Sequence, residues 1–192
     1  MSLIALKDKF DATCRVQAFK LNAYLGLRVK EKCSEQLKLS NRRFNIRVYG
    51  IVVSDRNELL VSDELIKGMQ FTKFPGGGLE WGEGLIECLK REFIEELNQQ
   101  IEVISHFYTT DYFQQSAFRE EDQLISVYYS VALTGKTGFT TKAKKFDFPD
   151  ELGNPNEIQR WVPIRELMVG DFKWPVDKVV AQRLIEQYAL SD

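Results

Sequence analysis

Three carboxylates follow one arginine in the middle of the chain: Glu92, Glu95 and Glu96 stand one, four and five residues after Arg91. Residues three and four apart on a helix share a face, so these carboxylates would crowd together and repel one another. A hard divalent cation relieves that repulsion, because Mg²⁺ and Mn²⁺ prefer oxygen ligands, retain water and bridge to phosphates. The spacing therefore predicts a divalent-cation site that works on a phosphorylated substrate.

A glycine run, Gly76–Gly78, precedes this segment and follows Pro75. Glycines let a backbone turn sharply and approach a ligand closely, so we expect this run to be a loop that binds substrate. Arg91 lies four residues before Glu95 and can hold a carboxylate through a forked hydrogen bond. Trp81 is a candidate for stacking on a base, although aromatic residues more often serve packing.

Two helices are expected around this segment. Residues 84–97 carry an apolar stripe with a step of four, and Asn98 follows where a left-handed residue ends many helices. The stripe consists of Leu85, Leu89, Phe93 and Leu97. A last helix begins at Pro175, since proline suits the first helical position.

Strands are expected on both sides of the first helix, where apolar residues alternate or cluster between turn residues. The expected strands are 44–53, 58–62, 101–110, 124–133 and 158–162. Residues 114–123 and 135–156 read as loops, and residues 1–43 as one or two helices. Strands interleaved with one central and one terminal helix indicate an α/β sandwich with a mixed sheet.

The full spacing, Gly77, Glu83, Arg91-Glu92 and Glu95-Glu96, resembles the signature of the Nudix hydrolases, the MutT-like family. The sequence departs from that signature at Asn98, where the family usually has glycine, and at Gln99, where it has an aliphatic residue. The resemblance implies a Nudix-type α/β/α sandwich over residues 44–192, with residues 1–43 as an N-terminal helical extension.

The resemblance also implies an activity. Such an enzyme is a pyrophosphohydrolase, a hydrolase of acid anhydrides: water attacks one phosphorus of a nucleoside diphosphate linked to another moiety. Mg²⁺ or Mn²⁺ would be the cofactor, held by residues that match the family's ligands: Gly77, Glu92, Glu95 and Glu96. Arg91 and Glu83 would keep loop and helix in register. The general base stays open between Glu96 and a later glutamate, for which we take Glu121.

Other functions on the same fold remain possible at this point. A Nudix-fold module could bind or sense a nucleotide without cleaving it, but such modules usually lose the carboxylates that this chain keeps. An isomerase of isoprenyl diphosphates would want a catalytic cysteine in an apolar pocket, for which we find no clear pattern. The sequence does not select one nucleoside diphosphate derivative as substrate.

Composition indicates which partners and which cellular compartment to expect. The formal net charge is −2 over 192 residues and the pI is about 5.6, which argues against a nucleic-acid polymer as partner. Three cysteines without a metal-binding spacing suggest reduced thiols and a cytoplasmic protein. No apolar run approaches the length of a membrane span, so we expect no membrane contact. The family resemblance suggests a homodimer.

Overall fold

The structure is a computed structural model, and it describes residues 42–149 and 156–190. The expected helical extension at the N-terminus falls on residues 1–41, outside the described part of the chain. The elements are β1 Arg43–Ile51, β2 Glu58–Ile66, β3 Met69–Lys73, β4 Gly76–Gly78, α3 Leu85–Leu97, β5 Gln100–Thr109, β6 Gln114–Gln115, β7 Asp122–Thr134, β8 Asn156–Pro163 and α4 Pro175–Ala189. Two short 3-10 turns, Ile164–Glu166 and Val169–Asp171, connect β8 to α4.

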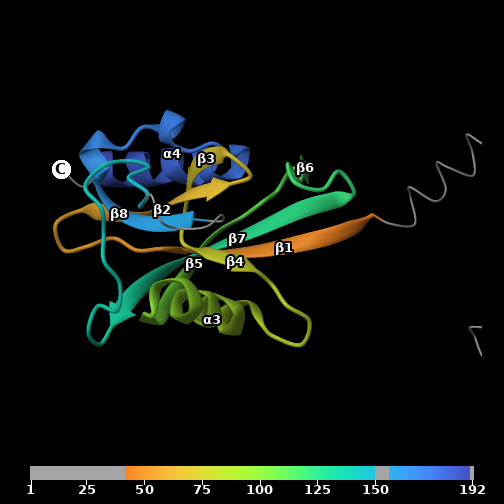
Figure 1. The fold of residues 1–192 in the computed structure, drawn as a ribbon, viewed down its shortest axis with the longest axis horizontal. Coiled ribbons are helices and arrows are strands. Elements are labelled where there is room, and N and C mark those ends of the chain that lie inside the picture. Colours follow the sequence, from red (N-terminus) through yellow and green to blue (C-terminus); the bar gives the residue numbers. More distant parts are fainter. Residues whose placement is uncertain (1–41, 150–155, 191–192) are drawn as a thin grey trace, which may run out of the picture. The chain divides into compact units, whose positions relative to one another are not determined.

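The strands form two sheets, one in the order β4-β1-β7-β5 with β6 beside β7, the other in the order β3-β2-β8. Four strand pairs are antiparallel, namely β1 with β4, β5 with β7, and β2 with both β3 and β8. Isolated parallel bridges join Thr72 to Phe172 and Thr141 to Gln159. Figure 1 shows α3 and α4 on opposite sides of the strands. This arrangement confirms the α/β sandwich with a mixed sheet.

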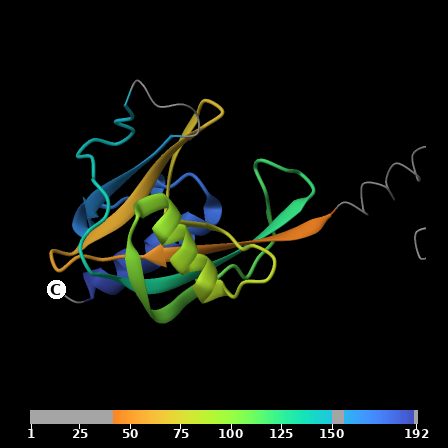
Figure 2. The same cartoon turned by 60° about the horizontal axis from the view of Figure 1, so that its bottom comes forward.

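Alternation along β1 explains why there are two apolar cores. Tyr49 and Ile51 pack into the core that α4 completes, whereas Val48 and Val52 pack against α3 on the other face. Successive side chains of a strand point to opposite faces, so one strand can serve both cores. Figure 2 shows α3 crossing in front of β1.

The ends of α3 are defined by local hydrogen bonds. The Glu87 carboxylate accepts from the Gly84 amide at 2.8 Å, and the apolar stripe of the helix is buried at Leu89, Phe93 and Leu97. Asn98 then takes the left-handed conformation with φ 50° and ψ 39°. The structure confirms both the expected helix and its end at Asn98. Asparagine can stand at this position because it tolerates the left-handed conformation next best after glycine.

Gln99, the second departure from the family pattern, is buried and fully bonded. Its amide nitrogen donates to the carbonyls of Gln100 at 2.9 Å and Thr134 at 2.8 Å. Its amide oxygen accepts from the Gly138 amide at 3.0 Å. A polar side chain thus ties the end of α3 to the segment after β7, where an aliphatic residue could only pack.

Three sequence-based expectations were wrong in part. The glycine run is not a loop but the short strand β4, whose register pairs Gly77 with Val48 of β1. The strand expected to end at residue 62 continues to Ile66, and β3 was not expected. A three-glycine strand has no side-chain alternation to reveal it, and its stability comes from backbone pairing with β1.

Of the described residues, 42–43 and 115–123 belong to one compact unit, and 44–114, 124–149 and 156–190 belong to another. In the first of these units, the Arg43 guanidinium donates to the buried Asp122 carboxylate at 2.7 and 3.2 Å. This fork is a long-range contact that fixes the start of β1 against the start of β7. Among the described residues, no helix is long and apolar enough to cross a membrane.

Asp177 is a fully buried carboxylate at the start of α4. The Tyr128 hydroxyl donates to it at 2.6 Å, and Tyr128 itself stacks on Tyr49 with ring centroids 5.1 Å apart. Burial raises the pKa of Asp177 to about 7, because the charged carboxylate loses its hydration. The tyrosine hydrogen bond opposes that shift only in part.

We expect Asp177 to make the fold less stable as the pH rises. Its folded pKa, about 7, exceeds its ordinary value of 3.8, so between these pH values the folded chain binds more protons. Stability is therefore lost as pH rises through this window, by up to about 4 kcal/mol. Asp177→Asn removes the ionisation, so its melting temperature relative to the natural chain should rise from pH 4 to pH 8. An equal pH dependence of both proteins would contradict this assignment.

Candidate active site

Arg91, in the middle of α3, donates hydrogen bonds to the loop before the helix, to β4 and to its own helix. This set of hydrogen bonds is called the Arg91 hub below. The Arg91 guanidinium donates to both Glu83 oxygens at 2.7 and 3.0 Å, and to the Gly78 carbonyl at 3.0 Å. It also donates to Glu92 and Glu95, each at 3.0 Å. One side chain thus fixes loop, strand β4 and helix face together, as the forked geometry of arginine permits.

Glu83 closes the loop that connects β4 to α3. One of its oxygens accepts from the Glu80 amide at 2.8 Å as well as from Arg91. The Arg91 hydrogen bonds, followed by the Glu80 amide, lower the pKa of Glu83 to about 2. Glu83 is therefore ionised at any physiological pH and serves as an anchor for Arg91.

Glu92 lies under the glycine strand. Its side chain is 11% exposed, and a Cβ added to Gly77 would overlap all three atoms of its carboxyl group. Gly77 thus leaves the space that the Glu92 carboxylate occupies. This close approach explains why a glycine is needed at this position, although the position is a strand rather than a loop.

Lys73, the last residue of β3, places an ammonium group beside these carboxylates. Its Nζ lies 2.6 Å from Glu64, 3.7 Å from Glu96 and 2.9 Å from the Gly76 carbonyl oxygen. The Lys73 side chain is only 4% exposed. Burial alone would lower the pKa of Lys73, but the nearby carboxylates, led by Glu157, outweigh it and raise the pKa.

Glu64 and Glu157 lie opposite each other in the antiparallel pair of β2 and β8. Carboxylate oxygens of Glu64, Glu96 and Glu157 all lie within 4.8 Å of one another. Burial raises the pKa of Glu96, and the neighbouring charges of Glu157, Glu92 and Glu64 add to the shift, while Lys73 opposes it. This gathering of oxygen donors has the chemistry that Mg²⁺ or Mn²⁺ prefers.

The other residues named from the sequence lie in different settings. Glu95 is more than half exposed and bonds to Arg91, and Trp81 is fully exposed in the loop before α3. Glu121 belongs to the separate compact unit, where its backbone carbonyl accepts from the Arg43 amide at 3.2 Å. The catalytic role of Glu121 and the substrate contact of Trp81 stay predictions.

Sequence reasoning missed Lys73, Glu64 and Glu157. Lys73 stands two residues before Pro75, so its distance from the glycine run was a usable signal. Glu64 and Glu157 carry no local signal, because only the register of β2 against β8 brings them together. Long-range strand pairing of this kind is not visible in the spacing of residues.

Comparisons with known proteins agree with this geometry. The family model of the NUDIX domain matches residues 44–183, which is most of the chain. The comparison with curated proteins found no significant match.

Several solved structures share the fold at low sequence identity. One is a MutT from work on Aliivibrio salmonicida and Vibrio cholerae, with 22% identity, a TM-score of 0.54, and coverage of 76% of this chain and 99% of that one. A MutT NUDIX hydrolase from Burkholderia pseudomallei has 15% identity, a TM-score of 0.56, and coverage of 73% and 98%. A structure described as a UDP-X diphosphatase has 16% identity, a TM-score of 0.53, and coverage of 96% and 82%.

The matched range contains the glycine strand, the Arg91 hub and the carboxylates of α3, in the order that the family signature requires. The chain belongs to the NUDIX domain family and is a Nudix hydrolase.

Proposed function

We propose that this chain hydrolyses the phosphoanhydride bond of a nucleoside diphosphate derivative with the help of Mg²⁺ or Mn²⁺. The observation that carries the proposal is the Arg91 hub, which sets Glu92 and Glu95 on one helix face beside the glycine strand. Glu96 extends the same face toward Glu64 and Glu157. Carboxylates crowded in this way are costly without a cation and useful with one.

The donor set fits a hard divalent cation, because it consists of carboxylate oxygens and backbone carbonyls. Glu92, Glu95, Glu96 and the Gly77 carbonyl would hold the ion, with Glu64 and Glu157 next to them. When bound, the ion would activate water and offset the negative charge of a pyrophosphate. Arg91 keeps Glu92 and Glu95 in place, and Glu83 keeps Arg91 in place.

Glu96 is our choice for the general base. It is partly exposed, so water can reach it, and its carboxylate lies beside those of Glu64 and Glu157 at the proposed cation site. Glu121 is the other candidate, and a kinetic comparison of the two variants decides between them.

Four residues are proposed to contact the substrate. Gly76, Gly77 and Gly78 are proposed to bind a phosphate chain through their backbone; Gly78 is partly exposed, whereas Gly76 and Gly77 are buried. The exposed Trp81 ring is available to stack on a base. The domain boundary at residue 44, a homodimer and a cytoplasmic location also stay proposals. The start of the family match at residue 44 supports that boundary.

A substrate panel tests the proposal. The full chain is incubated with Mg²⁺ or Mn²⁺ and with nucleoside triphosphates, ADP-ribose, nucleotide sugars, dinucleoside polyphosphates and CoA, and the products are separated. UDP-linked compounds belong in the panel because one similar structure is described as a UDP-X diphosphatase. We expect cleavage of one group, and its loss when EDTA removes the metal. Saturable binding with no cleavage of any compound would favour the silent nucleotide-binding module instead.

A further inference from the structure

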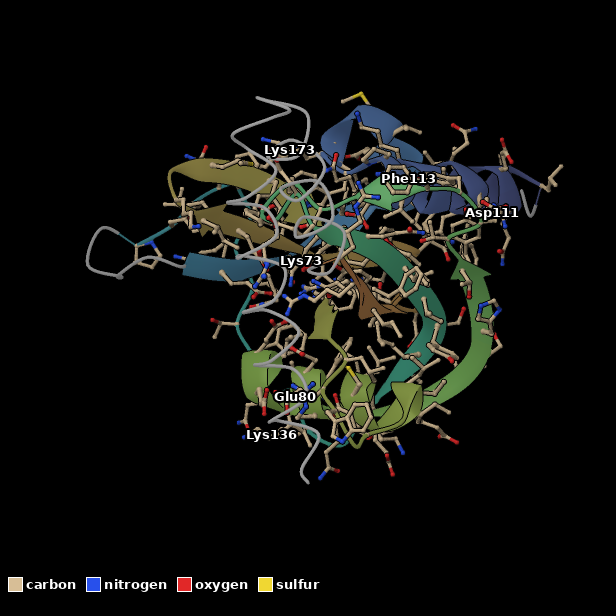
Figure 3. The ribbon with its side chains drawn as sticks, turned by 90° about the vertical axis from the view of Figure 1, so that its right-hand side faces the viewer. Lys73, Glu80, Asp111, Phe113, Lys136 and Lys173 are labelled. Atoms are coloured by element: carbon tan, nitrogen blue, oxygen red, sulfur yellow. The ribbon has the colours of Figure 1, made fainter. Side chains whose placement is uncertain are left out.

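The hydrolase chemistry above assigns no role to Lys73, the buried lysine at the end of β3. It lies outside the family signature, yet its ammonium group contacts both the glycine strand and a carboxylate of α3. Figure 3 shows Lys73 between the level of the three-stranded sheet and the level of α3, with Glu80 beyond it at the start of the helical region. Lys73 thus lies between the glycine strand β4 and the carboxylates of α3.

Each contact of the ammonium group has a definite direction. A lysine has three donors. One donates to the Gly76 carbonyl at 2.9 Å, one is directed to Glu64 at 2.6 Å, and Glu96 faces the group at 3.7 Å. Because the side chain is buried, water cannot replace these partners without rearrangement.

Glu64 is the tightest partner, and it is not among the residues proposed to hold the cation directly or to take up the proton. It comes from β2, and its contact with Lys73 fixes where the positive charge lies relative to Glu96 and Gly76. An ammonium held in this way fixes the Gly76–Gly77 peptide group and draws the Glu96 carboxylate toward the strand. Misplacement of a reacting group by about 1 Å can cost about 10² in rate, so such control matters.

We propose that Lys73, held by Glu64, is a positioning residue that orients both Glu96 and the Gly76–Gly77 peptide group. The inference rests on the proposed function as far as Glu96 is concerned. The orientation of the peptide group does not depend on it.

A buried ion pair nearby supplies a matched control. Arg160 of β8 donates to Asp63 of β2 at 3.0 and 3.3 Å, and the Arg160 side chain is 12% exposed while that of Asp63 is fully buried. Asp63 is the neighbour of Glu64, and alternation along β2 places the two on opposite faces. Arg160→Met therefore removes a largely buried cation from the same strands without a direct contact to the site.

The experiment compares Lys73→Met, the double variant Lys73→Met/Glu64→Gln, and Arg160→Met with the natural chain. Melting temperature, kcat, and the amide chemical shift of Gly77 without metal are measured for each. Gly77 is chosen because its amide shares a planar peptide group with the Gly76 carbonyl. The double variant removes one positive and one negative charge together, so it should fold even if Lys73→Met alone does not.

We expect the double variant to recover most of the melting temperature but to keep a kcat about 30-fold below normal and a displaced Gly77 amide signal. Arg160→Met should leave kcat within about threefold and the Gly77 signal in place. Recovery of kcat together with stability in the double variant would overturn the proposal and leave Lys73 a structural residue. If the natural chain cleaves no compound, the proposed function fails, while the Gly77 signal still decides whether Lys73 orients the peptide group.

Discussion

The Glu96→Gln variant is expected to lose about three orders of magnitude in kcat while it still binds substrate. Glutamine has nearly the same size as glutamate but cannot take up a proton or carry the charge that a cation requires. General base catalysis alone contributes about 10² to 10⁴ in rate, and loss of a metal ligand adds to that. The variant is measured by steady-state kinetics on the best compound of the panel and by calorimetric binding of the same compound.

Three further glutamine variants test whether the loss of kcat is specific to Glu96. Glu95→Gln should cost less than Glu96→Gln, because it removes one proposed cation ligand and its hydrogen bond to Arg91 but leaves the proposed general base in place. Glu102→Gln, at an exposed position of β5, should leave kcat unchanged. If Glu121→Gln loses more activity than Glu96→Gln, the general base is Glu121 and the role of Glu96 reduces to holding metal.

The helices of this fold could be predicted because their signals are local. The stripe of α3, its left-handed end at Asn98 and the proline that starts α4 all lie within one element each. The same holds for the Arg91 hub, since Arg91 and its carboxylate partners are held at fixed offsets by the helix and by the short loop before it. Local spacing therefore predicted the contacts between Arg91 and its neighbouring carboxylates.

The strands and the rest of the site could be predicted only in part. β4 is made of glycine, so it has no apolar alternation, and its pairing with β1 decides that it is a strand. Glu64 and Glu157 come together through the register of β2 and β8, and Lys73 joins them from the end of β3. A shift of one residue in that register would place the two glutamates on opposite faces of the sheet, and no short motif in the sequence specifies the register.

Gly77 is the second position at which we expect a substitution to have a large effect, because the backbone of β4 lies directly against Glu92. Alanine here would place a methyl group inside the Glu92 carboxyl group. The Arg91 hydrogen bond at 3.0 Å and the buried surroundings leave Glu92 little room to move away. We expect Gly77→Ala to lower kcat by about 10² and to destabilise the fold by about 2 kcal/mol, measured by urea unfolding.

Gly170→Ala is the matched control for Gly77→Ala, because nothing lies within 4 Å of an added Cβ at that position. It should change stability by no more than about 0.5 kcal/mol. Shortening Glu92 in the double variant Gly77→Ala/Glu92→Asp makes room for the methyl group and should recover stability. Activity should stay low, because the shorter carboxylate no longer reaches its place beneath the strand. Normal activity in Gly77→Ala would mean that Glu92 can leave this position freely, and that its contact with the glycine strand has no part in catalysis.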